Sequence, residues 1–199
     1  LGAGPEKPLI AVIQAFDWTL YPDLLRGEKN LRPPTYDELR CMTYAALVRR
    51  ANGLFYYCFD DGRWRMREHP QTWEAIQKVV AEVRVREPLF QAKHEWWPYD
   101  HDFADRTRRF NSALEASIAP ALLKVEKGTP AVPRGYYVLA VNTTDGEHRY
   151  RFRLPGEFEG EINVLGEDRT RPIQKNWVED EFSPYAVHVY GPIPMVDGK

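Results

Sequence analysis

Two continuous apolar runs, separated by a helical pattern, open the chain. The runs cover residues 7–16 and 54–59, and between them Leu39, Met42 and Leu47 recur at helical spacing. Strands of a parallel sheet are buried on both faces and therefore read as continuous apolar runs. The order strand, long loop, helix, tight turn, strand predicts a βαβ unit of a parallel sheet.

Capping signals mark the ends of the first predicted helix. Thr35 is a candidate N-cap, and Glu38 stands three residues further on, which is the spacing of a capping box. Pro34 suits the start of the helix, and Asn52-Gly53 is expected to end it. A short connection of this kind between helix and strand is typical of an α/β barrel.

A second helix is predicted from Pro70 to Arg86, with Pro88 stopping it. Its expected buried stripe consists of Trp73, Ile76, Val80 and Val83. Beyond it, residues 94–103 are expected to form an aromatic and acidic loop, and residues 106–118 a short helix. These segments are interpreted as a bridge between two domains.

The apolar pattern changes from a helical period to alternation after Pro120. Short strands are predicted at residues 121–126, 136–142, 148–154, 160–165 and 185–190. Asp145-Gly146 predicts a hairpin between the second and third of them. Alternation places Tyr150, Phe152 and Leu154 on one face of the third strand.

Short antiparallel strands at regular spacing indicate a β-sandwich. The expected fold class is therefore α/β plus all-β, with residues 1–119 in the α/β domain and residues 120–199 in the sandwich.

Composition is that of an ordinary globular protein: 43% hydrophobic, 28% charged, with a formal net charge of -2. No nucleic-acid partner is expected, because phosphate binding needs a concentrated positive field. No apolar run has the length of a membrane span, and no signal peptide is visible. The sequence leaves the compartment open, since a secreted or periplasmic location requires a signal peptide in sequence upstream of Leu1, which is not an initiator methionine.

No cofactor or metal is expected. Cys41 and Cys58 are interpreted as buried thiols of an α/β core. His94, Glu95 and neighbouring acids carry metal-binding groups, but their spacing matches no zinc site.

Aromatic residues are the unusual part of the composition, at 13% of the chain. Several are predicted in loops beside carboxylates, among them Trp18, Tyr21 and Trp64. Aromatic faces suit the C–H faces of sugar rings, while carboxylates and arginines bind sugar hydroxyls. The alternative interpretation is that these rings only cap the domain junction.

The chain resembles the C-terminal half of bacterial glycoside hydrolase-like proteins of the clan A type, a (β/α)8 barrel with an appended β-sandwich. The residues that carry the resemblance are 8–16 as seventh strand, Pro34-Thr35, Glu38 and 44–46 in the seventh helix, 53–59 as eighth strand, 73–76 in the eighth helix, and 137–142 and 182–190 in the sandwich. A barrel of this kind needs about 250 residues, so the resemblance implies that the chain is the end of a longer barrel. Upstream sequence or another chain is then expected to supply the other strands and cover the exposed strand edge.

The resemblance also implies a position for catalytic carboxylates. In this clan the acid/base follows the fourth strand, which lies outside this chain, and the nucleophile is a Glu that ends the seventh strand. Gln14 stands near that place instead and cannot form a glycosyl ester. Asp17 remains a candidate nucleophile, as do Asp60 and Asp61 after the eighth strand, where Arg63 or Arg65 would hold Asp61.

Two functions follow from this resemblance. The first is a glycoside hydrolase that cleaves oligo- or polysaccharide with carboxylate acid/base chemistry, its cleft lined by Gln14, Trp18, Tyr21, Arg63 and Trp64. The alternative is a non-catalytic glycan-binding or structural module that has lost hydrolysis. Asp60-Asp61-Gly62 is also open to a simple interpretation as a turn with solvated acids.

Overall fold

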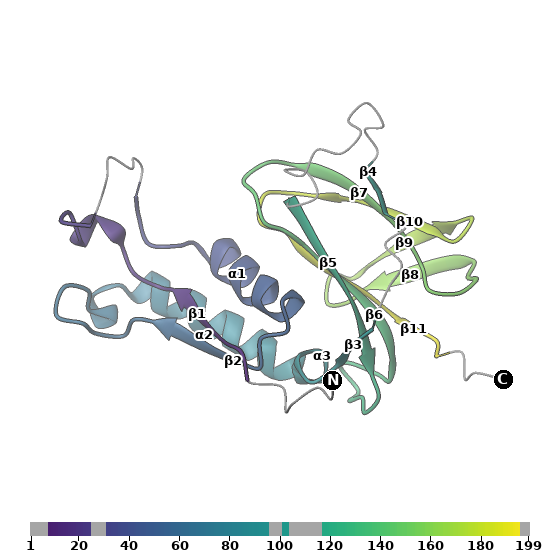
Figure 1. Cartoon of the computed structure of the whole chain (residues 1–199), viewed down its shortest axis with the longest axis horizontal. Coiled ribbons are helices and arrows are strands. Elements are labelled where there is room, and N and C mark those ends of the chain that lie inside the picture. The colour runs from purple at the N-terminus through teal and green to yellow at the C-terminus, as the bar shows by residue number, and fades with distance from the viewer. Residues whose placement is uncertain (1–7, 25–30, 96–100, 104–116, 196–199) are drawn as a thin grey trace, which may run out of the picture. The chain divides into compact units, whose positions relative to one another are not determined.

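The chain divides into two compact units, residues 1–84 and residues 85–199, as the computed structural model in Figure 1 shows. The structure describes residues 8–24, 31–95, 101–103 and 117–195. Unit 1 has parallel strands with helices, and unit 2 has antiparallel strands, so the predicted α/β part followed by an all-β part is confirmed. The division precedes the change of pattern after residue 119, because β3 (Lys93–Glu95) already pairs with a strand of unit 2.

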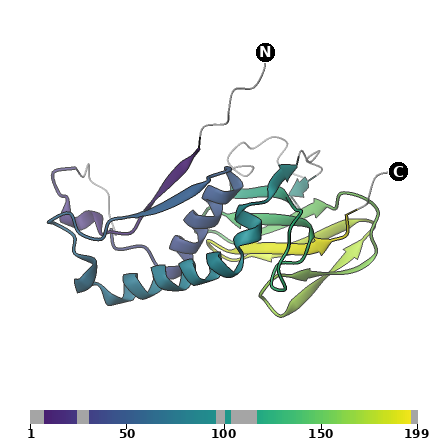
Figure 2. The ribbon, with the colours of Figure 1, turned by 90° about the horizontal axis from the view of Figure 1, so that it is seen from below.

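Unit 1 has the predicted order strand, helix, strand, helix. Strand β1 (Ile10–Gln14) pairs in parallel with β2 (Gly53–Tyr57). Helix α1 (Tyr36–Val48) connects the two strands, and α2 (Pro70–Val85) follows β2. Both helices pack on the same face of the strand pair, which Figure 2 shows from below. The sheet in the described part of unit 1 has only these two strands.

The N-terminus of α1 is closed by the capping box that the sequence predicts. The Thr35 hydroxyl accepts from the Glu38 N–H at 3.3 Å, and the Glu38 carboxylate accepts from the Thr35 N–H at 2.7 Å. The predicted end of the helix is wrong: it ends at Val48, and Arg50, not a glycine, takes the left-handed conformation with φ 64°. Asn52 instead begins the strand pairing, since its N–H donates to the Leu9 carbonyl at 2.7 Å.

A single carboxylate joins α1 to α2. Glu82 of α2 accepts from Arg40 at 2.9 Å, from Tyr44 at 2.8 Å and from Tyr36 at 3.2 Å. Hydrogen bonds to a charged group are among the stronger ones in proteins. Glu82 therefore holds the two helices of unit 1 in register.

The two faces of the strand pair differ. The face toward the helices carries Ile13, Ala15 and Cys58, which are buried with residues of α1 and α2. The opposite face carries Val12 and Phe55, which are 64% and 62% exposed. The prediction that these strands are buried on both faces is therefore wrong for this structure, because the helices cover one face only. We call the other side the open face; its large apolar residues are Ile10, Val12, Phe55, Tyr57 and Phe59.

Unit 2 is built on one antiparallel sheet, and its strands follow the hydrogen-bonded order β3-β5-β6-β11-β8-β9-β10-β7-β4. Their bounds are β4 (His101–Phe103), β5 (Ile118–Val125), β6 (Gly135–Asn142), β7 (His148–Arg153), β8 (Gly160–Val164), β9 (Arg169–Gln174), β10 (Trp177–Phe182) and β11 (Val187–Ile193). A short helix, α3 (Glu87–Phe90), precedes β3. The expected loop at 94–103 thus has strands at both ends, while the expected helix at 106–118 lies outside the described residues except for its end, where Ile118 starts β5.

The predicted hairpin across Asp145-Gly146 does not form. Strand β6 pairs with β5 and β11, whereas β7 pairs with β10 and β4. The turn itself is present, because the Asn142 side chain donates to the carbonyls of Gly146 and Ser183 at 2.7 and 2.8 Å. A turn signal specifies a change of direction, and here the chain changes its strand partners as well.

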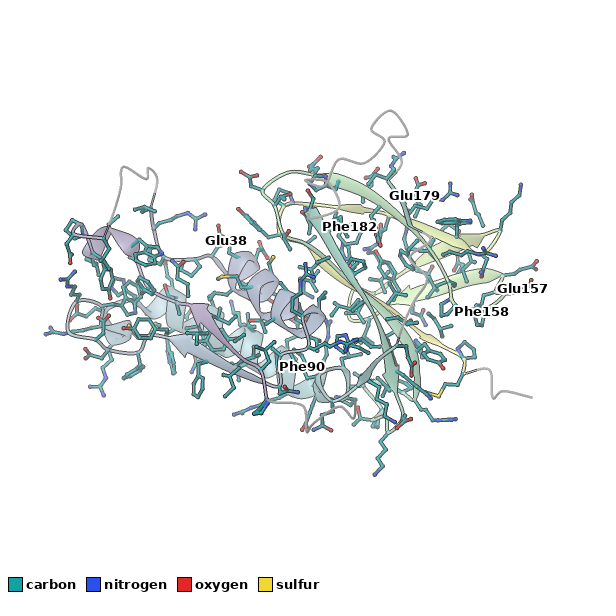
Figure 3. All side chains as sticks on the ribbon, in the orientation of Figure 1. Glu38, Phe90, Glu157, Phe158, Glu179 and Phe182 are labelled. Atoms are coloured by element: carbon teal, nitrogen blue, oxygen red, sulfur yellow. The ribbon has the colours of Figure 1, made fainter. Side chains whose placement is uncertain are left out.

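The sheet curls so that distant strands of the order face one another across a common core. Phe152 of β7 lies 4.8 Å from Tyr190 of β11, ring centre to ring centre, although three strands separate β7 from β11 in the sheet. Both rings are fully buried, as are Tyr150 and, at 1% exposed, Phe182, labelled in Figure 3. This two-layer packing of antiparallel strands is the predicted sandwich, made from one continuous sheet.

A charged cluster is buried within this curled sheet. Asp180 is 3% exposed and accepts from the Tyr190 hydroxyl at 2.9 Å and from Arg169 at 2.8 Å. Arg169 also pairs with Glu167 at 2.8 Å, and Glu167 lies 2.6 Å from Nδ1 of His188. The cluster ties β9, β10 and β11 together through side chains.

Candidate functional site

Two loops of unit 1 meet at one end of the strand pair. One follows β1 and contains Asp17 and Tyr21; the other follows β2 and contains Asp61 and Arg63. Because β1 and β2 are parallel, both loops leave the same edge of the sheet. The Tyr21 hydroxyl donates to Asp61, and Arg63 forms an ion pair with Asp23 at 2.5 Å. We call these two joined segments, residues 15–23 and 58–65, the loop pair.

Asp61 is the most heavily bonded acceptor of the loop pair. Besides Tyr21, the N–H groups of Arg63 and Trp64 donate to it at 3.1 and 2.9 Å, and the Tyr57 hydroxyl at 3.3 Å. These donors, the Tyr21 hydroxyl first among them, lower the pKa of Asp61 to about 2. Asp61 thus stays ionised with its oxygens engaged, an arrangement that holds the loops rather than one that attacks a substrate.

The predicted support of Asp61 by an arginine takes a different form in the structure. Arg63 reaches Asp61 through its backbone N–H, while its guanidinium pairs with Asp23 and lies 5.3 Å from the centre of the Tyr21 ring. Burial, followed by the hydrogen bond to Asp61, raises the pKa of Tyr21 far above its ordinary value. Tyr21 is therefore a neutral donor at any physiological pH.

Asp17 and Asp60 use one carboxylate oxygen each within their own loops. Asp17 accepts from the Thr19 N–H at 2.8 Å and caps a short 3-10 helix, residues Trp18–Leu20. Asp60 accepts from the Gly62 N–H at 2.9 Å. Among the described residues, no group donates to the second oxygen of either carboxylate. These two acids are the carboxylates of the loop pair with acceptor capacity to spare.

An aromatic cluster lies at the same end of the strand pair as these acids. The Phe16 ring makes edge contacts with Trp18, Tyr21 and Tyr57, with centroids 4.7, 5.1 and 5.8 Å apart. Tyr57 is 48% exposed and Trp18 is half-buried, whereas Phe16 and Tyr21 are buried. The cluster therefore offers two partly open rings on a rigid aromatic base.

The structure gives Gln14 and Trp64 local roles. Gln14 is partly buried, and its side-chain amide donates to the Phe16 carbonyl at 3.1 Å. Trp64 is fully buried and stacks on His69 with ring centres 3.7 Å apart. A sugar ring has no access to Trp64 in this structure, because the indole forms part of the core.

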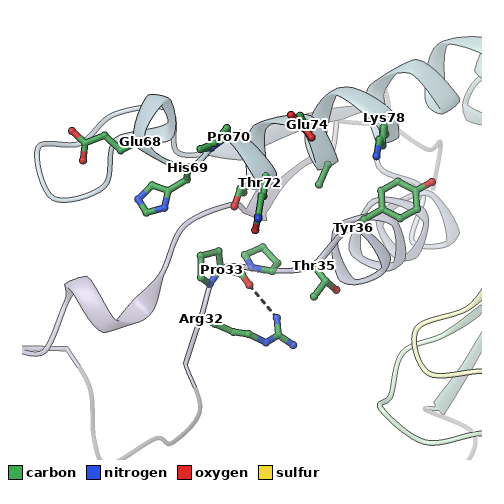
Figure 4. A pocket seen from close by; sticks show the side chains of 13 residues that line it. Arg32, Pro33, Thr35, Tyr36, Glu68, His69, Pro70, Thr72, Glu74 and Lys78 are labelled. Carbon is green, nitrogen blue, oxygen red and sulfur yellow. Dashed lines mark hydrogen bonds between the residues drawn. The ribbon is translucent and has the colours of Figure 1, made fainter.

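A second concave feature in unit 1 was not singled out by the sequence. It is a groove of about 710 Å³ between the loop that leads into α1 and the first turns of α2. Figure 4 shows His69 and Thr72 on one wall and Arg32 and Pro33 on the other, with Lys78 at one end. Prolines mark the start of both helices in the sequence. No sequence pattern, however, indicates that the two helix N-termini face one another.

Among the described residues, no group of three or more His, Cys, Asp or Glu side chains gathers as a metal site. In the same part of the chain, no helix is both long and apolar enough to cross a membrane.

Comparisons with known proteins find a likeness in structure and none in sequence. No protein-family model matches the sequence, and no curated protein matches it. In three dimensions the chain is similar to part of an Anoxybacillus α-amylase, whose crystal structure is described as providing insights into a new glycosyl hydrolase subclass. The TM-score is 0.48 at 14% sequence identity, over 80% of this chain and 33% of the amylase chain. This chain thus spans about a third of the length of that protein, and the likeness concerns the fold.

Proposed function

We propose that this chain is a carbohydrate-binding part of a glycoside hydrolase-like protein and that the loop pair holds the sugar. The observation that carries the proposal is that an aromatic cluster and two acids with free acceptor capacity lie at the same end of the strand pair. Trp18 and Tyr57 offer ring faces to the C–H side of a sugar, and Asp17 and Asp60 offer acceptors to its hydroxyls.

Preorganisation supports a binding role for the loop pair. Asp61 is held by donors from both loops, and Tyr21 is fixed between Asp61 and the Phe16 ring. Side chains that are already ordered lose less conformational entropy on binding. The loop pair thus meets an incoming sugar with its framework in place.

Hydrolysis is a second candidate function, favoured by the unused oxygens of Asp17 and Asp60. A retaining glycosidase needs two carboxylates about 5–5.5 Å apart, and an inverting one needs about 6.5–9.5 Å. Under this proposal one of these acids works with a carboxylate from the remainder of the barrel. Asp61 then serves as a positioning residue.

The open face supports the further proposal that unit 1 belongs to a larger barrel. Val12 and Phe55 are more than half exposed there, and the outer edges of β1 and β2 have no strand partner among the described residues. Exposed apolar faces and unpaired strand edges are features that proteins cover. The partner we propose is a set of parallel strands, supplied by upstream sequence or by another chain.

Binding is tested by calorimetric titration of the chain with maltotriose, cellotriose, mannotriose and xylotriose. Replacing Trp18→Ala is expected to weaken binding about tenfold or more, since aromatic contacts contribute strongly to recognition. Trp177→Ala is the matched control, because Trp177 is a partly exposed tryptophan on β10, in unit 2 and outside the loop pair. Equal affinities for both variants would contradict the proposal.

Hydrolysis is tested in the complete protein, which contains the remainder of the barrel, by following reducing-end release from the bound sugar. If the acids are catalytic, Asp17→Asn or Asp60→Asn abolishes release while binding persists. Binding without release over long incubation leaves the glycan-binding module as the function.

A further inference from the structure

The groove between the N-termini of α1 and α2 has two walls of different character. On the α1 side the polar groups already have partners. Arg32 forms a bidentate ion pair with Glu38, at 2.6 and 2.9 Å, and Thr35 takes part in the capping box. On the α2 side, Glu68 pairs with Arg65 and His69 stacks on Trp64. The other polar side chains of this wall have no hydrogen-bond or ion-pair partner among the described residues: Gln71, Thr72, Glu74 and Lys78.

Thr72 is the most informative of these residues. It is only 6% exposed, lines the groove, and its hydroxyl has no hydrogen-bond partner among the described residues. Figure 4 shows it on the wall that faces Pro33. The hydroxyl is not among the fully enclosed unsatisfied atoms of the described residues, so it opens onto the groove. A hydroxyl that has no protein partner and opens onto a groove is available to a ligand there.

The remaining polar groups form a stripe along α2. Gln71, Glu74 and Lys78 stand three and four residues apart and so project from one face of the helix. The stripe lines the groove while remaining exposed to solvent, and its groups include both donors and acceptors.

The charges of the groove are mixed in sign and favour a neutral ligand over a simple ion. Glu68 and Glu74 would repel an anion, while Lys78 and Arg32 would repel a cation. The groove also has apolar surface from Pro33, Pro34, Pro70 and the ring of Tyr36. A neutral ligand with many hydroxyls and an apolar C–H face satisfies both kinds of surface.

We propose that this groove is a second binding site, separate from the loop pair, for a neutral oligosaccharide. Its volume of about 710 Å³ lies within the range of about 300–1,000 Å³ that small-molecule sites occupy. The hydroxyl of Thr72 and the stripe of α2 bind the sugar hydroxyls, and the prolines contact its C–H face. The choice of a sugar over other neutral polyols rests on the proposed function.

Calorimetric titration of the full chain with the four neutral trisaccharides tests this site. The wild-type chain is expected to bind two molecules. Thr72→Val, which removes the hydroxyl at nearly constant volume, is expected to weaken one of the two sites about fivefold or more. The same variant is expected to leave the thermal midpoint of the free chain nearly unchanged, because the hydroxyl has no hydrogen-bond partner among the described residues.

A second variant probes the stripe without touching the core. The combined replacement Glu74→Ala and Lys78→Ala is expected to abolish that same site, and Gln77→Ala is the control, because Gln77 is exposed on α2 outside the groove. Unchanged binding in the combined variant would overturn the inference, as would a groove that takes inorganic phosphate in place of the sugars.

The variants also separate this inference from the proposed function. If Trp18→Ala removes all binding and the groove variants change nothing, the groove is not a site and the proposed function stands. If only the groove variants lose binding, the groove is the site and the loop pair is not. A wild-type chain that binds none of the sugars contradicts both.

Discussion

The two units of the chain treat their apolar side chains differently. In unit 2 the curled sheet closes over its own core, and Tyr150, Phe152 and Tyr190 are fully buried. In unit 1 the strands are covered on one face only, and of the eleven large apolar residues that are exposed in the described chain, ten lie there. Apolar strands in both units therefore form a closed core only where the chain also supplies a second layer of structure to cover them.

Their charged groups differ in the same sense. Unit 2 buries Asp180 within the sheet, where Arg169 and Tyr190 compensate its charge. Unit 1 keeps Asp17, Asp60 and Asp61 in loops at the end of the strands. Buried and paired charges serve architecture, whereas acids on loops at strand ends are placed where ligands arrive.

The largest expected effect is the difference in stability loss between removing a buried ring of unit 2 and removing an exposed ring of unit 1. Phe152→Ala is expected to lower the free energy of unfolding of unit 2 by about 3–5 kcal/mol, because it removes a fully buried ring. Phe55→Ala on the open face is expected to change the free energy of unfolding of unit 1 by less than about 0.5 kcal/mol. Urea unfolding measures both, and similar losses would break the comparison.

The open face is expected to affect self-association of the chain rather than its stability. Because its apolar residues and strand edges are uncovered, the isolated chain is expected to self-associate, and Val12→Ser with Phe55→Ser is expected to reduce that association. Sedimentation velocity at several concentrations measures the effect. A wild-type chain that remains a monomer at every concentration would show that the face is tolerated by itself.

Asp61 is expected to contribute to the loss of folding stability at low pH. Its folded pKa of about 2 lies below its ordinary 3.8, so its contribution is complete above about pH 4 and is lost as the pH falls toward 2. Tyr21→Phe removes the largest cause of the shift and is expected to move the pKa of Asp61 up toward 3.8. Carboxyl NMR titration measures it, and an unchanged pKa would show that the backbone donors suffice.

The capping box gives a smaller effect. Thr35→Ala is expected to lower the free energy of unfolding of unit 1 by about 1 kcal/mol, since it removes a side-chain acceptor from the first turn of α1. Thr35→Ser keeps the acceptor and is the control. Losses of equal size in the two variants would assign the effect to the lost methyl group.

The smallest effect is expected at the surface of unit 2. Arg149 pairs with Glu179 and Glu181 on exposed strand positions, at 3.5 and 2.8 Å. Exposed ion pairs contribute little to stability. Arg149→Ala is therefore expected to leave the urea midpoint unchanged, and a clear shift would show that this face takes part in the stability of the sheet.

Local signals in the sequence predicted local structure well. The capping box of Thr35 and Glu38, the helix that begins at Pro70 and the alternation of Tyr150 and Phe152 all appear in the structure. Each depends on residues within a few positions of one another, and their interactions are the same in any fold.

Strand partners were harder to predict. The turn at Asp145-Gly146 is present without its hairpin, because β6 and β7 find better partners elsewhere in the sheet. Strand β10 was not predicted because one of its three inward positions is Asp180, a charged residue whose burial depends on partners from other strands, Arg169 and Tyr190. Strand β9 is never fully buried and so carries no apolar pattern.

The sequence predicted several residues of the candidate site but not the contacts between them. Sequence order pointed to Asp17, Tyr21 and Asp61, but not to the hydrogen bond between Tyr21 and Asp61, which spans 40 residues. The burial of Trp64 likewise depends on His69 and the start of α2. Residue types at strand ends can be recognised in a sequence, whereas their contacts depend on how separate loops meet.

The position of β11 in the sheet has a consequence for biosynthesis. Strand β11 lies between β6 and β8, and both of these precede it in the chain. Until residues 187–193 have been made, no strand joins β6 to β8 by hydrogen bonds, and only the turn between β6 and β7 connects the two halves of the sheet. Nascent unit 2 thus has an unpaired strand edge on each half until β11 is in place, a state that is prone to aggregation.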